Sequence, residues 1–410
     1  MHYFYGRTFF RSQLVRPPID LLLCILHRLE LPQALAFASV CTTWRSTAVA
    51  AGVPSSSAPW LMSWADLLKG REKRGRCSSA VTCNFHHLLD VDKAYGVSVP
   101  HGCFVACCGA SHGWLVLVNE ISNLVLYNPF TTATIHLPPI TDFACVDAVY
   151  NDEGNLEHYL ETGRVHGIAS LGAWFYQLAV LSCSPSKGGD YVVMIIHRDN
   201  DWLSFVKSGQ SKWQAASSTI MGRDRYADCA YHYGRFYAVT FHGMVEQWDI
   251  DGLNGATRKV VVAAEIHAGP ILSRHLLSTS WGDLLQVHAH LEIGYPDGIR
   301  FQIHKVSQDR CKRLPRKDFI DHALFLGLNH SACLPTKKFP KLRGQCIYYS
   351  APWMVISLEW LSRLPHRWGG VKTYDLKTRK FEHVFPFPLP DCKRSTPDPT
   401  PYEVWITPNL

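Results

Sequence analysis

Histidine side chains at 288 and 290 are spaced so that they could bind a metal ion together. His288 and His290 lie two residues apart, so on a β-strand both would point to the same face and could act as a pair of ligands. The sequence offers this pair no third ligand. We therefore interpret the two residues as ordinary strand histidines and expect no metal there.

The fourteen cysteines include two close groups, and neither group has the spacing of a known zinc module. No Cys-x-x-Cys pair occurs. Reduced and mostly buried thiols in a cytosolic or nuclear protein are the simplest interpretation, and we expect no cofactor. The two groups are Cys103, Cys107 and Cys108, and Cys77, Cys83, His86 and His87.

The remaining polar residues show no set of converging acids and bases. A phosphate-binding glycine loop and a His-Glu-x-x-His pair are both missing. Asp249 and Asp375 end two similar strand-like segments, a position where aspartate starts a tight turn by bonding its own backbone. The sequence predicts turn roles for both residues and a chain that is not an enzyme.

Three short helices are predicted between Pro18 and Ala48. Pro18 suits the first position of a helix, and Asp20 in the first turn is favourable toward the helix dipole. Apolar residues recur at the spacing of one helix face, namely Leu22, Ile25, Leu26 and Leu29. So short a module buries little core of its own, and we expect it to bind a partner. A helical hairpin that caps a larger domain is the alternative.

Beyond residue 100 the pattern changes to short strands separated by polar turns. Segments 113–117 and 124–129 form one unit, and segments 234–239 and 245–250 form another. Each unit pairs an apolar strand with a strand that ends in an aromatic residue and Asn or Asp, and 371–376 repeats the second half. Repetition every 40 to 50 residues or so predicts a β-propeller, with the number of blades left open. A large β-sandwich is the structural alternative.

Residues 18–45 contain Pro-x-Asp-Leu-Leu-x-x-Ile, then Arg-Leu, Leu-Pro and Val-Cys-x-x-Trp-Arg. This order resembles the F-box, the helical module that docks on the Skp adaptor of cullin-RING ubiquitin ligases. Pro17 in place of the usual Leu, and Thr42-Thr43 in place of a pair that is often basic, depart from the family pattern. The resemblance implies nine residues shared between the module's core and the adaptor contact: Pro18, Leu22, Ile25, Leu26, Leu29, Leu35, Val40, Cys41 and Trp44.

A second pattern lies at 323–349, where Ala-Leu-Phe-Leu-Gly is followed by Leu-Arg-Gly-Gln-Cys-Ile-Tyr-Tyr. With Pro-Trp-Leu at 59–61 and Gly-Trp-Leu at 113–115, it resembles a plant family of the KIB type, in which an F-box precedes a kelch-like propeller. The family normally has Asn where Gln345 stands. We interpret 323–327 and 344–349 as buried strands that pack in the core and perform no chemistry.

The sequence thus predicts an α+β multidomain chain, with a small all-α F-box followed by an all-β propeller. The expected domains are an irregular leader at 1–16, the F-box at 17–52, a linker leading into the second domain at 53–100, and the propeller at 101–410.

Charge and hydropathy limit the kinds of partner. The net charge is +7, and we interpret the basic groups at 69–76, 310–317 and 337–343 as solvated surface, not as a nucleic-acid site. No apolar run approaches the roughly 18 residues of a membrane-spanning helix. The leader is basic and has no acid before Asp20, as in organelle transit peptides. We expect the nucleus and/or cytoplasm, with a mitochondrion or plastid as the alternative.

Together the two resemblances imply the substrate-recruiting subunit of an SCF-type cullin-RING E3 ubiquitin ligase. The F-box would dock on the Skp adaptor, and through it on a cullin, while the propeller binds an unknown protein substrate. Tethering would raise the effective concentration of substrate at the ligase. The alternative is a non-ligase propeller scaffold or interaction protein, for example one that binds a kinase or an organellar protein, with a remnant F-box.

Overall fold

The structure is a computed structural model that divides the chain into two compact units, Met1–Ser55 and Ser56–Leu410. The leader at 1–16 lies outside the described residues. No helix in the described part of the chain is both long and apolar enough to cross a bilayer. The described residues are 17–26, 28–29, 31–51, 59–63, 81–87, 90–99, 104–199, 201–217, 224–252, 255–264, 271–291, 299–308, 310–327, 330–339, 342–350, 371–383 and 403–406.

Helices α1 (Ile19–Leu26), α2 (Leu31–Ala38) and α3 (Thr42–Ala50) form the first unit. Helix α1 begins directly after Pro18, whose carbonyl accepts hydrogen bonds from the backbone N–H groups of Leu21 and Leu22. One side of each helix contributes to a small apolar core that consists of Leu22, Leu26, Ala34, Phe37 and Ala48. The Phe37 and Trp44 rings pack beside that core with their centroids 4.2 Å apart.

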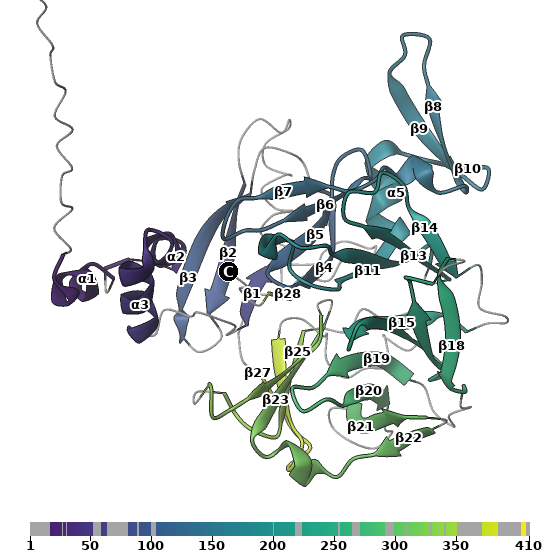
Figure 1. Cartoon of the computed structure of the whole chain (residues 1–410). Helices are drawn as coiled ribbons and strands as arrows, with labels where there is room; N and C mark the ends of the chain where they lie inside the picture. The colour runs from purple at the N-terminus through teal and green to yellow at the C-terminus, as the bar shows by residue number, and fades with distance from the viewer. Residues whose placement is uncertain are drawn as a thin grey trace, which may run out of the picture. The chain divides into compact units, whose positions relative to one another are not determined.

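Mostly antiparallel β-sheets follow one another around a ring in the second unit (Figure 1). We number them as blades in chain order. Blade 2 is β4 (Ala106–Ser111), β5 (Trp114–Val118), β6 (Leu124–Tyr127) and β7 (Thr134–His136). Blade 3 is β11 (Tyr176–Leu181), β12 (Val192–His197), β13 (Trp202–Lys207) and β14 (Gln214–Ser217). Blade 4 is β15 (Tyr226–His232), β16 (Arg235–Thr240), β17 (Val245–Asp249) and β18 (Thr257–Val262).

Blades 5 and 6 are joined in one nine-stranded sheet through a single parallel pair, Ser278 with Ala332. Blade 5 is β19 (Ile271–Ser278), β20 (Leu284–Leu291), β21 (Ile299–Ser307) and β22 (Arg310–Arg313). Blade 6 is β23 (His322–Leu326), β24 (Ala332–Pro335), β25 (Cys346–Ser350), β26 (Val371–Asp375) and β27 (Phe381–His383). Blade 6 contains one parallel pair, β23 with β25. Short 3-10 helices lie at η1 (Ile140–Asp142), η2 (Pro185–Lys187) and η3 (Arg316–Phe319).

The ring closes in blade 1, where strands from the two ends of the second unit pair. Trp60 lies opposite Ile406, and Leu61 lies opposite Trp405. Strand β28 also contacts β4 of blade 2 and β25 of blade 6. The 53–100 segment, predicted as a linker, therefore contributes three strands to the propeller. The four strands of blade 1 are β28 (Glu403–Ile406), β1 (Trp60–Ser63), β2 (Val81–His87) and β3 (Asp90–Val99).

Neighbouring blades bury both faces of each sheet, which is why their strands are apolar on both sides. In β25 the side chains alternate between two cores. Ile347 and Tyr349 pack toward blade 5, while Cys346 and Tyr348 pack with Trp405 of blade 1. In the described residues the six blades form the β-propeller that the strand repeats predict, and the segments 323–327 and 344–349 supply its buried strands as expected.

The polar ends of the repeated strands make the predicted turns. Asn128 Oδ1 accepts hydrogen bonds from the backbone N–H groups of Phe130 (2.9 Å) and Thr131 (3.1 Å). Asp249 Oδ1 accepts one from Asp251 at 3.2 Å, and Asp375 Oδ1 accepts two in the same way. The turn roles of Asp249 and Asp375 are confirmed.

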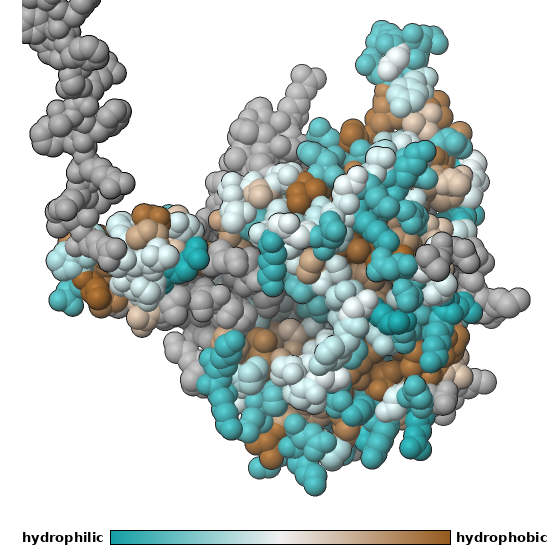
Figure 2. Space-filling view, in the orientation of Figure 1, coloured by the Kyte–Doolittle hydropathy of each residue, from teal (hydrophilic) through white to brown (hydrophobic). Residues whose placement is uncertain are grey.

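An insertion between blades 2 and 3 interrupts the repeat. It consists of a three-stranded sheet, β8 (Val146–Tyr150), β9 (Leu156–Glu161) and β10 (Arg164–His166), and helix α5 (Ile168–Phe175). The β8–β9 hairpin projects from the propeller, and Figure 2 shows its tip as hydrophilic. The apolar side of α5 returns to the core, because Leu171 and Phe175 are buried in the cluster between blades 2 and 3.

Candidate functional site

Three large apolar side chains on the helical unit are exposed although the unit has a core of its own. Ile19 and Leu21 on α1 are 62% and 52% exposed, and Val40 in the turn between α2 and α3 is 60% exposed. Leu21 lies outside the helix face that contributes Leu22 and Leu26 to the core, and Ile19, at the first position of α1, is not part of that core. These three side chains are apolar groups that the unit leaves accessible to a partner.

The nine residues predicted for the F-box separate into three groups by burial. Leu22, Leu26 and Leu35 are buried. Three others are half-buried beside the core, and three are exposed. The half-buried residues are Ile25, Leu29 and Trp44, and the exposed residues are Pro18, Val40 and Cys41. Ile19 and Leu21, which the family pattern did not single out, join the exposed group.

Polar side chains between β15 and β19 have the residue types of a serine-hydrolase triad. Ser273 Oγ lies 3.2 Å from His275 Nε2, and His275 Nδ1 lies 3.7 Å from Asp228 Oδ2. The second distance is too long for a hydrogen bond. Ser273 Oγ is also within hydrogen-bonding distance of the Tyr349 hydroxyl of blade 6, at 3.0 Å.

Asp228 joins two blades through its carboxylate. Its Oδ2 accepts a hydrogen bond from the backbone N–H of Leu276 on the next blade at 2.8 Å, and its Oδ1 accepts one from Cys229 at 2.7 Å. Burial raises the pKa of Asp228. Both oxygens are thus occupied by backbone donors, and the arrangement ties blades 4, 5 and 6 together instead of activating a serine.

The expectation that the chain contains no Gly-x-Ser-x-Gly elbow is wrong, because this pattern occurs at 109–113. In hydrolases this pattern places the serine on a sharp turn between a strand and a helix. Here Ser111 ends β4, and His112 (φ 52°) and Gly113 (φ 81°) form the two-residue turn of a hairpin. Ser111 Oγ accepts a hydrogen bond from the backbone N–H of Leu181 at 3.2 Å. The motif builds a hairpin and a contact between blades.

The histidines at 288 and 290 lie on β20, as the sequence predicts. The His304 ring of β21 stacks on His288 with centroids 4.9 Å apart and an angle of 13° between the planes. No group of three His, Cys, Asp or Glu residues in the described ranges is arranged to hold a metal ion. The stacked rings therefore pack against each other within blade 5.

Ten cysteines have side chains that the structure describes, and all ten are free thiols. Cys24 and Cys41 are exposed, whereas Cys107, Cys108, Cys229, Cys333 and Cys346 are buried. Burial raises the pKa of Cys107 to about 12. Such thiols stay protonated at neutral pH and react slowly. Cys77 and Cys103 lie outside the described residues.

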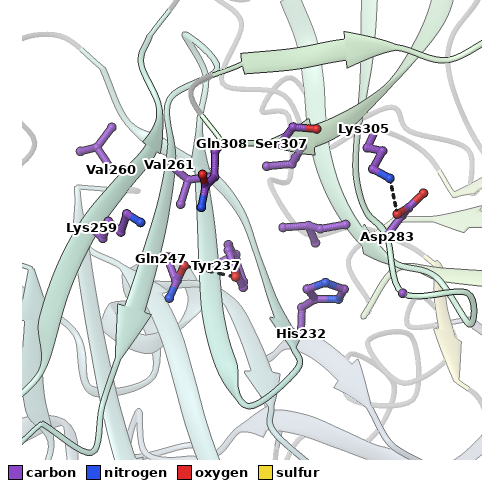
Figure 3. Close-up of a pocket in the computed structure, with 13 residues that line it drawn as sticks. His232, Tyr237, Gln247, Lys259, Val260, Val261, Asp283, Lys305, Ser307 and Gln308 are labelled. Carbon is purple, nitrogen blue, oxygen red and sulfur yellow. Dashed lines mark hydrogen bonds and ion pairs between the residues drawn. The ribbon is translucent and has the colours of Figure 1, made fainter.

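A cleft of about 400 Å³ opens between blades 4 and 5 (Figure 3). Val261, Leu284 and Val306 belong to the core between these blades and contribute the apolar part of the lining. Lys305 Nζ lies 2.6 Å from Asp283 Oδ1 within the cleft. His232 Nδ1 lies 2.8 Å from Ser278 Oγ, and burial lowers the pKa of His232. Sequence reasoning gave no signal for this cleft, because its walls come from separate repeats.

Comparison with known proteins gives two family matches and one curated relative. The KIB1-4 β-propeller model matches residues 85–376, and the F-box domain model matches residues 18–49. An Arabidopsis thaliana protein named as an F-box protein is 33% identical over 128 residues, and the alignment spans 30% of this chain and 30% of that relative. The chain thus aligns with less than a third of the curated protein's length.

Solved structures show weak likenesses. A chain of the nidogen/laminin complex is 10% identical, with 85% of this chain and 98% of that chain covered and a TM-score of 0.39. TolB from Acinetobacter baumannii is 8% identical, with 83% and 69% covered and a TM-score of 0.38. Neither bears on fold or function.

The family matches agree with the geometry of both units. The propeller match covers more than two thirds of the chain, and the F-box match covers the helices α1, α2 and α3 up to residue 49. The plant F-box propeller resemblance predicted from residues 18–45 and 323–349 is confirmed. This chain belongs to the KIB1-4 β-propeller family and contains an F-box domain at residues 18–49.

Proposed function

We propose that this chain is the substrate-recruiting subunit of an SCF-type cullin-RING E3 ubiquitin ligase. The F-box docks on a Skp adaptor and, through it, on a cullin, while the propeller binds a protein substrate. The chain performs no bond chemistry itself. It holds the substrate near the ubiquitin-charged conjugating enzyme, which raises the effective concentration of the two reactants. The free thiols of the described residues support a reducing compartment, the nucleus and/or cytoplasm.

The observation that carries this proposal is the exposed apolar surface of the F-box. Ile19, Leu21 and Val40 remain accessible although the three helices have a core of their own. Removing one such side chain from water in an interface contributes about 1.5–3 kcal/mol. A few buried apolar anchors of this kind can supply most of the binding energy of a protein contact.

Co-purification of the full chain with a Skp adaptor tests the proposal. The double substitution Ile19→Glu with Val40→Glu should reduce adaptor capture more than about a hundredfold, because two apolar contacts are lost. Gln33→Glu is the matched control, since Gln33 is an exposed polar residue on α2 and the change adds the same kind of charge. The control should bind as the parent does.

Substitutions at exposed residues remove the contact with the adaptor without disturbing the folded core of the helical unit. Leu22 is completely buried in the helical core, so Leu22→Ala would lose the adaptor through unfolding of the unit and would not report on the contact itself. Unchanged capture by the Ile19→Glu, Val40→Glu chain, or no capture by the parent, would overturn the ligase role. The chain would then be a propeller scaffold with a remnant F-box.

A further inference from the structure

We propose that the cleft between blades 4 and 5 binds an extended acidic segment of the protein substrate. This inference rests on the proposed function and adds the chemical class of the substrate segment. Three features of the described residues support it: an open sheet edge, an excess of basic side chains, and an apolar part of the lining.

The cleft lies beside the outer edge of blade 4, at strand β18. Strand β18 is the last strand of blade 4, and β22 is the last strand of blade 5, so in the described part of the chain neither outer edge pairs with a further strand. Strand β18 also lies near β21 and β22 of blade 5. Residues 257–260 of β18 are exposed one after another, as on a strand whose outer side is uncovered. An extended segment can pair with such an open strand edge.

Basic side chains surround the cleft. Lys259 and Lys305 lie on opposite sides of it (Figure 3). On β22, Arg310, Lys312 and Arg313 are exposed. The sequence from 305 to 317 contains six Lys or Arg residues and a single acid, Asp309. This edge of the propeller therefore has a strong excess of positive charge.

The nearby carboxylates are already neutralised. Asp283 pairs with Lys305, and Glu246, which is completely buried, pairs with Arg258 at 3.2 Å. Lys259 and Lys312 have no ion pair within the described residues. Carboxylates on an incoming segment would supply the missing partners, and complementary charge of this kind favours both encounter and register.

The apolar lining favours a peptide over a nucleic acid. Val260 and Val261 of β18 and Val306 of β21 line the cleft beside the lysines. An extended peptide points successive side chains to opposite sides, so it can present carboxylates and apolar groups in alternation. A nucleic-acid strand carries a charge at every phosphate, and its bases pack mainly on aromatic faces and not on aliphatic side chains such as these valines.

Fluorescence anisotropy of the full chain tests this inference. The probe is a short labelled peptide that alternates glutamate and valine, compared at about 0.15 M salt with a peptide that alternates lysine and valine. We expect binding of the acidic peptide alone. Lys259→Glu with Lys312→Glu should weaken it about tenfold, since two favourable ion contacts become repulsive. Lys212→Glu with Lys377→Glu, at exposed sites in other blades, is the matched control and should leave binding within about twofold.

Several outcomes would overturn the inference. They are no binding of the acidic peptide, equal binding by the two double variants, and stronger competition by a single-stranded RNA of the same charge than by the unlabelled peptide. Adaptor capture is scored on the same samples and reports the ligase role separately. Capture without peptide binding overturns only the cleft assignment, whereas peptide binding without capture supports the cleft while the ligase role fails.

Discussion

Replacing Gly344 with alanine should destabilise the propeller, because Gly344 lies directly against another segment of backbone. A Cβ built on Gly344 would lie 1.9 Å from the carbonyl oxygen of Ile320. Carbon and carbonyl oxygen ordinarily approach no closer than roughly 3.3 Å, so one segment must move by more than about 1 Å. A backbone oxygen has no rotamer that would relieve the clash.

The expected loss combines this displacement with the hydrogen bonds next to it. The Gln345 backbone N–H is shared between the carbonyls of Phe319 and His322, at 2.9 Å each, and the Gln345 carbonyl accepts from Leu376 at 2.9 Å. Overpacking costs about 1–3 kcal/mol, and each lost hydrogen bond adds about 1 kcal/mol. We expect the free energy of unfolding to fall by about 3 kcal/mol, which lowers the melting temperature by roughly 6–12 °C.

Thermal unfolding followed by circular dichroism measures this change. Gly189→Ala is the control, because nothing lies within 4 Å of a Cβ built at Gly189. The control should melt within about 1 °C of the parent. A Gly344→Ala chain that melts together with the control would refute the close approach of Gly344 to Ile320.

Two further predictions concern buried histidines and one backbone angle. Burial lowers the pKa values of His197 and His330 to about 3, so both stay neutral in the fold while the unfolded chain takes up protons below about pH 6.5. As the pH falls from 6.5 to 5, the free energy of unfolding should fall with a slope that rises from about 0.7 toward about 1.4 kcal/mol per pH unit for each histidine. Urea unfolding should show a shallower pH slope for His197→Gln, and an unchanged slope would contradict the assignment. Gln345 has a φ of 56°, in the left-handed region that asparagine tolerates better than glutamine does. Gln345→Asn should therefore raise the melting temperature by about 1–3 °C. A lower melting temperature would show that the longer glutamine side chain stabilises the fold by more than its backbone strain destabilises it.

The repeated strands could be predicted because their signal is local. Segments 113–117 and 124–129 alternate apolar strands with turn-forming residues, and they become β5, β6 and the turn at Asn128. The closure of the ring left no such signal. Strand β28 has four residues, and its partner β1 lies at the other end of the second unit, so neither length nor periodicity connects them.

Only part of the structural role of the family pattern at 342–349 could be predicted from the sequence. Its apolar residues do form a buried strand, as the sequence predicts. The role of Gly344 could not be read in the same way, because it depends on Ile320, a residue outside the pattern. The positive φ of Gln345 was equally hidden. Periodicity reports which side chains are buried, whereas close backbone approach depends on how distant segments meet.

The F-box shows the same limit at the candidate site itself. Periodicity marks apolar residues, and a side chain in the module's core looks the same in sequence as one reserved for a partner. The structure separates them, with Leu22 and Leu26 inside and Ile19, Leu21 and Val40 outside. Since core loss and contact loss both abolish binding, only substitutions in the exposed set can show whether this F-box engages an adaptor. A functional test designed from the sequence pattern alone would have mixed the two effects.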